Sequence, residues 1–106
     1  MNTTNLILIT IIAEDELESR LVADLKKFGA RGHTVCRVRG EGDHGERSSA
    51  WEGENIKLEA IVDAGSADAI CEHVSQNYFP KYATILYLTP VQVLRGAKFI
   101  RNQKAE

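Results

Sequence analysis

The sequence predicts an α+β domain with the ferredoxin-like element order βαββαβ. Three observations lead to this fold class. Four short segments are apolar or alternate in polarity, as strands do. Two longer segments carry apolar residues at helical spacing. The six segments follow one another as strand, helix, strand, strand, helix and strand, and the length of 106 residues is that of one domain. We therefore expect a single domain over residues 1–106.

The first strand is expected at residues 5–13, where Ile and Leu fill both faces, which is typical of a strand covered on both sides. A helix should follow, because an apolar stripe recurs at helical spacing: Leu17, Leu21, Leu25 and Phe28. Asp15 and Glu18 have the spacing of a capping box at its start. Gly29 is suited to end it.

The second and third strands are expected at residues 33–40 and 54–64. In the third, one face holds Ile56, Leu58, Ala60 and Val62. A second helix should begin near Gly65 and end before Pro80, with the stripe Ala67, Ile70, Cys71, Val74 and Tyr78. The fourth strand is expected at residues 82–90, closed by Pro90. The tail, 91–106, should pack as far as Ile100.

Right-handed crossovers would place both helices on one face of a four-stranded antiparallel sheet. The other face would then expose apolar residues from the first and last strands. An exposed apolar sheet face indicates burial against another subunit, so we expect a homo-oligomer.

Residues 39–54, "RGEGDHGERSSAWEGE", join two strands that should pair as a hairpin, yet the loop is far longer than a hairpin turn. Its glycines allow backbone N–H groups to turn toward an anion. Arg39 and Arg47 could supply phosphate contacts, and Ser48 or Ser49 a hydroxyl. The alternative is a solvated loop whose acidic and basic charges cancel. Trp51 is either a partner anchor or a lid over a ligand.

Composition excludes several functions. The net charge of −2 creates no overall field for nucleic acid, so we expect no nucleic-acid partner. The opening lacks a basic segment and a cleavage site, which favours a cytoplasmic protein with reduced thiols. Cys36 is expected to be a buried small hydrophobe. The histidines and cysteines lack metal-ligand spacing, so no metal site is expected.

An enzyme of this fold, a small phosphatase, would need an anion-binding loop after the first strand. The junction "IIAEDE" is acidic and would repel phosphate. This alternative, and a metal-tolerance trimer of related topology, stay open with less support than a binding protein.

Five stretches together resemble the PII-like signalling proteins: "GARGHTV", the loop with "GEG" and "RSS", "ENIKLEAIV", "YFPKYATILYL" and "VQVLRGAKF". The resemblance runs from Leu6 to about Phe99. It is strongest to the inorganic-carbon branch, which comprises the regulators of the SbtA bicarbonate transporter and the carboxysome-associated PII proteins.

The resemblance implies a non-enzymatic homotrimer that binds adenine nucleotide in the clefts between subunits. It implies that the loop at about 40–53, the T-loop, responds to the ligand and contacts a protein partner. The expected ligand-binding residues that match the family pattern are Gly32, His33, Thr34, Gly40, Gly42, Arg47, Ser48, Gly96 and Phe99. Lys98 has no match in the pattern but stands nearby, and we add it as a residue that could contribute charge.

The chain departs from the family in two ways. "SQNYFPKYA" is too short for the lysine-glycine segment of true PII proteins, and the C-terminus lacks the cysteine pair of many transporter-linked members. These departures favour the carboxysome-associated type, with ADP or AMP and bicarbonate as ligands. The alternative is a transporter-regulator type that binds cyclic AMP, AMP, ADP or ATP. The partner would be a membrane bicarbonate transporter or a carboxysome-linked protein.

Overall fold

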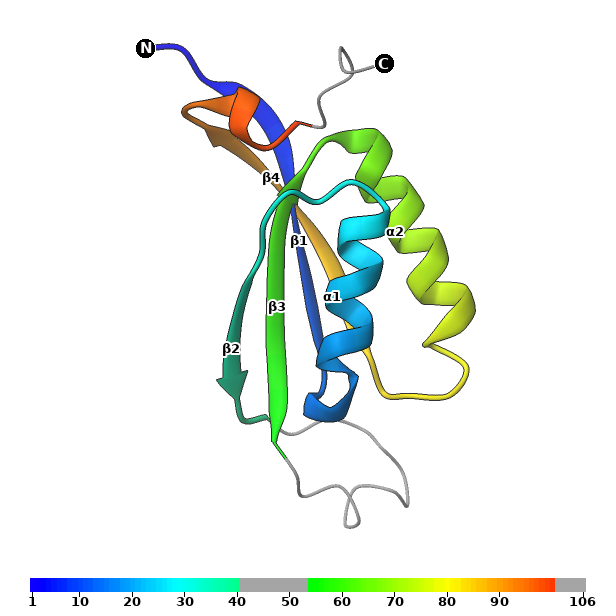
Figure 1. The fold of residues 1–106 in the computed structure, drawn as a ribbon. Helices are drawn as coiled ribbons and strands as arrows, with labels where there is room; N and C mark the ends of the chain where they lie inside the picture. The colour runs from blue at the N-terminus through cyan, green and yellow to red at the C-terminus, as the bar shows by residue number, and fades with distance from the viewer. Residues whose placement is uncertain (41–53, 101–106) are drawn as a thin grey trace.

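The computed structural model describes residues 1–40 and 54–100 and confirms the βαββαβ order (Figure 1). The elements are β1 (Thr4–Glu14), η1 (Asp15–Leu17), α1 (Glu18–Lys27), β2 (Thr34–Val38), β3 (Asn55–Val62), α2 (Ala64–Asn77), β4 (Ile85–Val93) and η3 (Gly96–Lys98). The four strands form one antiparallel sheet in the order β2-β3-β1-β4. Both helices lie on the same face of it, as expected (Figure 1).

The core lies between the sheet and the two helices. Alternate residues of the central strands point toward the helices and are buried: Ile9, Ile11, Ala13, Ile56, Leu58, Ala60 and Val62. The predicted helical stripes meet them, with Leu17, Leu21, Leu25, Ala67, Ile70, Val74 and Tyr78 also buried. Cys71 is only half-buried. Burial of these aliphatic side chains is the main force that holds the helices on the sheet.

The predicted capping box at the first helix is wrong. The chain first makes the 3-10 turn η1, and neither η1 nor α1 has a side-chain cap. The Asp15 backbone N–H instead donates to the Glu54 carbonyl at 3.1 Å, and the Asp15 carboxylate lies 3.6 Å from Arg37 Nη1. Asp15, which the sequence pattern assigned to the helix cap, therefore makes tertiary contacts instead. The second helix is capped by Asp63, which accepts from the Ser66 N–H at 2.8 Å.

The prediction that Pro90 ends the last strand is also wrong. β4 begins later than expected and continues through Pro90 to Val93, and Pro90 pairs in register with Ile7 of β1. β4 is an edge strand. An edge strand tolerates proline because the missing N–H can be on the side that has no neighbour.

The sheet face opposite the helices, called the open face below, carries apolar side chains, as expected. Ile85 and Tyr87 of β4 are 51% and 46% exposed. Thr10 of β1 is buried there, and its Oγ1 has no hydrogen-bond partner among the described residues. Cys36 is exposed rather than buried, so that expectation was wrong: strand alternation turns it away from the helix side to which its neighbour Val35 packs.

No helix in the parts of the chain that the structure describes has the length and apolar character needed to span a membrane.

Candidate functional site

A pocket of about 320 Å³ lies at one end of the open face. Its lining comes from the α1–β2 corner, from β1 and β3, and from the segment after β4: Leu8, Gly32, His33, Thr34, Glu59, Ala60, Ile61, Lys98 and Phe99. These residues are far apart in the sequence. The fold therefore builds the pocket from four separate segments.

The corner that forms one wall begins where α1 ends. Gly29 adopts a φ of 120°, which L side chains rarely adopt, and a Cβ there would clash with the Ser66 hydroxyl. The predicted glycine stop is thus confirmed, and it also lets α1 approach the start of α2. Gly32 differs, because nothing lies within 4 Å of the place where its Cβ would be. At Gly32 the missing side chain leaves open space in the pocket wall.

The floor is made by the open-face residues of two central strands. Leu8 of β1 pairs with Ile61 of β3, and Thr34 of β2 pairs with Glu59 of β3. Glu59 is half-buried and lines the pocket together with the exposed Lys98, so the lining includes both an acidic and a basic residue. The sequence pattern does not single out Glu59. Its position beside Thr34 follows from the register of the two strands, which the pattern does not show.

The segment after β4 forms the second wall. Arg95 adopts the left-handed conformation, with φ 59°, and turns the chain into η3. Gly96 is buried against β1, where a Cβ would clash with the Thr4 side chain. Further along, the Ile100 carbonyl accepts a hydrogen bond from Arg31 Nη1 at 2.9 Å. These contacts bring Lys98 and Phe99 against the corner at Gly32–Thr34.

The predicted ligand-binding residues have different outcomes. The structure brings five of them together in the pocket: Gly32, His33, Thr34, Lys98 and Phe99. Gly96 packs against Thr4 at the base of the second wall but does not line the pocket. Gly40 follows the opposite end of β2 and is outside the described lining. Gly42, Arg47 and Ser48, with Trp51, lie outside the described residues. The ligand contacts of all ten remain predictions.

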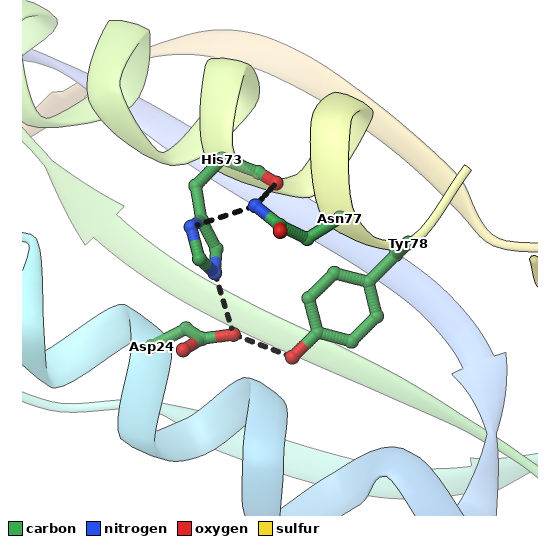
Figure 2. Close-up of polar contacts among 4 residues, drawn as sticks. All are labelled: Asp24, His73, Asn77 and Tyr78. Atoms are coloured by element: carbon green, nitrogen blue, oxygen red, sulfur yellow. Dashed lines mark hydrogen bonds and ion pairs between the residues drawn. The ribbon is translucent and has the colours of Figure 1, made fainter. Parts of the chain in front are cut away.

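A second polar cluster joins the two helices (Figure 2). Asp24 Oδ2 of α1 accepts from the Tyr78 hydroxyl and lies 3.1 Å from His73 Nε2 of α2. Asn77 Nδ2 lies 3.2 Å from His73 Nδ1 and donates to the His73 carbonyl at 2.9 Å. An amide nitrogen only donates, so Nδ1 accepts, and the Nε2 proton points to Asp24.

The chemistry of this cluster is structural. Burial, and then the hydrogen bond to the Asp24 carboxylate, raise the pKa of Tyr78 to about 12. The tyrosine thus stays neutral and donates to Asp24. The polar atoms drawn in Figure 2 bond mainly to one another, which suits a clasp between α1 and α2. In residues 1–40 and 54–100, no three or more His, Cys, Asp or Glu side chains gather as metal ligands would.

Comparison with known proteins identifies the family. The family model for nitrogen regulatory protein P-II matches residues 6–98. This match covers most of the chain, and the protein therefore belongs to the P-II family.

Solved structures agree with this assignment. A PII-like signalling protein from Thermus thermophilus is 47% identical, with a TM-score of 0.81, over 93% of this chain and 99% of that one. CPII from Thiomonas intermedia, bound to ADP, AMP and acetate, has a TM-score of 0.84 at 20% identity, over 95% and 100% of the two chains. The same protein bound to ADP and bicarbonate has a TM-score of 0.80 at 23% identity, over 92% and 97%. At identities of 20% and 23%, the likeness to CPII shows that the two proteins share a fold and nothing more.

Proposed function

We propose that this P-II family protein is a non-enzymatic sensor that binds an adenine nucleotide, ADP or AMP, in the open-face pocket. The observation that carries the proposal is the pocket itself. It gathers the Gly32–Thr34 corner and Phe99, which the sequence resemblance selected independently as ligand-binding residues, and the nearby basic residue Lys98. CPII, which has the same fold, binds ADP and AMP in its crystals.

The pocket chemistry suits a nucleoside. Leu8, Ile61 and Phe99 offer apolar surface for a purine ring, and Phe99 can stack on it. The Glu59 carboxylate is an acceptor, which fits ribose hydroxyls or the adenine amino group. A phosphate beside Glu59 would be repelled, so the phosphates extend away from the floor, on the Lys98 side.

The proposal places the remaining phosphate contacts on a neighbouring subunit. The pocket lies at the start of β2, whereas the 40–53 loop leaves from its end. Arg47 and Ser48 would therefore reach a nucleotide most directly from another copy of the chain. A homotrimer with its open faces turned inward provides this arrangement. The exposed Ile85 and Tyr87 support burial of that face.

Bicarbonate is the proposed second ligand, and inorganic-carbon status the signal that the loop passes to a protein partner. CPII bound to ADP and bicarbonate supports this choice. Binding changes the loop only through the difference in ligand affinity between its states. The alternative is a regulator of a bicarbonate transporter. It predicts that cyclic AMP binds in addition to ADP or AMP.

Calorimetry tests the proposal. ADP, AMP, ATP and cyclic AMP are titrated into the full chain, with and without bicarbonate. ADP or AMP should bind with a Kd in the micromolar range, and Lys98→Ala should weaken ADP about tenfold, the loss of one charge-assisted contact. Lys26→Ala removes the same charge outside the pocket and serves as the control. Absence of nucleotide binding below millimolar concentration would contradict the sensor, and steady turnover of ATP or ADP would favour the enzyme.

A further inference from the structure

One long-range hydrogen bond joins the two walls of the pocket. Arg31, in the α1–β2 corner, donates from Nη1 to the backbone carbonyl of Ile100 at 2.9 Å, across 69 positions of sequence. Arg31 is exposed and does not belong to the described pocket lining. Its guanidinium thus acts on the wall that contains Lys98 and Phe99, while the next residue, Gly32, is already part of the pocket.

The second wall has an anchor at each end. At one end Gly96 packs so closely on Thr4 of β1 that a Cβ would clash with the threonine side chain. At the other end the Ile100 carbonyl is held by Arg31. Lys98 and Phe99 lie between these two points and face the corner. Within the segment the Lys98 and Phe99 N–H groups donate to the Arg95 and Gly96 carbonyls, so without Arg31 its far end would depend on these short-range bonds and on the packing of Gly96.

We propose that Arg31 is a positioning residue of the ligand pocket: it holds Lys98 and Phe99 against the Gly32–Thr34 corner before the ligand arrives, and it does not contact the ligand itself. The inference rests on the proposed function and deepens it. A pre-ordered wall saves the ligand the entropy of ordering residues 97–100, so affinity should depend on an arginine outside the pocket.

The competing role for Arg31 is a direct contact with the nucleotide phosphates. The two roles differ in which ligands they affect. A direct contact favours ADP over adenosine, which has no phosphate. A positioning role acts through Phe99 on the nucleoside portion and so affects both ligands. For adenosine, which has no phosphate for Lys98 to bind, the positioning role also predicts that Arg31 matters little once the Phe99 side chain has been removed.

Hydrogen exchange on the ligand-free protein tests the anchor directly. In Arg31→Ala the amides of residues 98–100 should exchange about tenfold faster, as expected for release of a local hydrogen-bonded segment. Amides of β3, residues 56–62, should not change. Arg31→Lys should restore most of the protection, because a single N–H donor suffices for one carbonyl. Unchanged exchange at 98–100 in Arg31→Ala would overturn the proposal whether or not nucleotide binds.

Calorimetry with ADP and with adenosine tests the consequence. Arg31→Ala should weaken both ligands, adenosine about tenfold and ADP at least as much because Lys98 is released together with Phe99, and Lys26→Ala should weaken neither. With adenosine, the double variant Arg31→Ala/Phe99→Ala should bind no more weakly than Phe99→Ala. A loss confined to ADP, or a double variant with fully additive losses, would overturn the positioning role. Failure of the wild-type chain to bind ADP would instead contradict the proposed function, a result that the exchange experiment distinguishes.

Discussion

The helix-covered face and the open face of the sheet differ in how far one chain completes them. On the helix side, aliphatic residues of β1 and β3 are buried under α1 and α2, and a polar clasp at Asp24 and Tyr78 ties the helices together. On the open face, Ile85 and Tyr87 are about half exposed, the Thr10 hydroxyl is buried without a partner among the described residues, and Glu59 faces a pocket. Among the described residues, the helix side is the more completely packed of the two faces.

This difference indicates that the helix side determines the stability of the fold, whereas the open face serves assembly and ligand binding. Substitutions on the helix side should change the free energy of unfolding. Substitutions on the open face should change assembly and ligand binding. Substitutions at positions that differ in face or in burial, each with a control variant, test this division.

The largest effect is expected for Tyr87→Glu on the open face. If this face is buried in a homotrimer, the new carboxylate would be desolvated in each subunit at a cost of several kcal/mol. The trimer should dissociate, as measured by light scattering after size-exclusion chromatography. Phe79, after α2, is also 46% exposed, and Phe79→Glu should leave the assembly intact. An intact trimer in Tyr87→Glu would place the interface elsewhere.

Leu58→Ala should be the most destabilising of the conservative changes. Leu58 is 0% exposed in the helix-side core, and truncating a buried leucine costs about 2–5 kcal/mol. Leu88 of β4 is 43% exposed, so Leu88→Ala provides the control and should cost less than about 1 kcal/mol. Urea denaturation measures both. Equal losses for the two variants would contradict the assignment of the core.

Tyr78→Phe should remove about 2–3 kcal/mol, because it breaks a hydrogen bond to a carboxylate. The folded state raises the pKa of Tyr78 to about 12, above the unfolded value of about 10. The contribution is therefore full below pH 10 and is lost as the pH rises toward 12. The stability difference between the wild type and Tyr78→Phe should shrink over that window. A difference that stays constant to pH 12 would contradict the role of this hydroxyl.

Two glycines of one corner should respond differently to alanine. Gly29→Ala meets both the positive φ and Ser66, and should cost about 1 kcal/mol or somewhat more. Gly32→Ala has open space and should leave the free energy of unfolding unchanged, while placing a methyl group in the pocket wall. Thermal denaturation and ADP titration of both variants separate the two effects. A destabilising Gly32→Ala would mean that the corner is more closely packed than described.

The elements of the fold were predictable from the sequence because the core follows simple periods. The stripes at Leu21 and Val74, and the alternation at Leu58, depend only on which face is apolar. The misplaced details depend on tertiary neighbours. Asp15 has the sequence spacing of a helix cap, but its N–H donates to the Glu54 carbonyl and its carboxylate lies near Arg37. Pro90 continues β4 because β4 is an edge strand.

The site was predictable in part for a similar reason. The corner and the C-terminal segment were recognised from a family pattern, and the structure brings them into one pocket. Glu59 was not recognised as a site residue, because its position beside Thr34 follows from strand register, which no local sequence pattern shows. Arg31 was missed as well, since its contact is with the Ile100 backbone at the other end of the chain.

The central claim is that the open-face pocket, and not the helix side, receives an adenine nucleotide. Backbone amide chemical shifts measured during an ADP titration test it most directly. The account predicts saturable shifts at Gly32, His33, Thr34 and Phe99, with the amides of Asp24 and His73 in the helix layer unchanged. Saturable shifts confined to the helix layer, or no saturable shift at the corner at millimolar ADP, would contradict it.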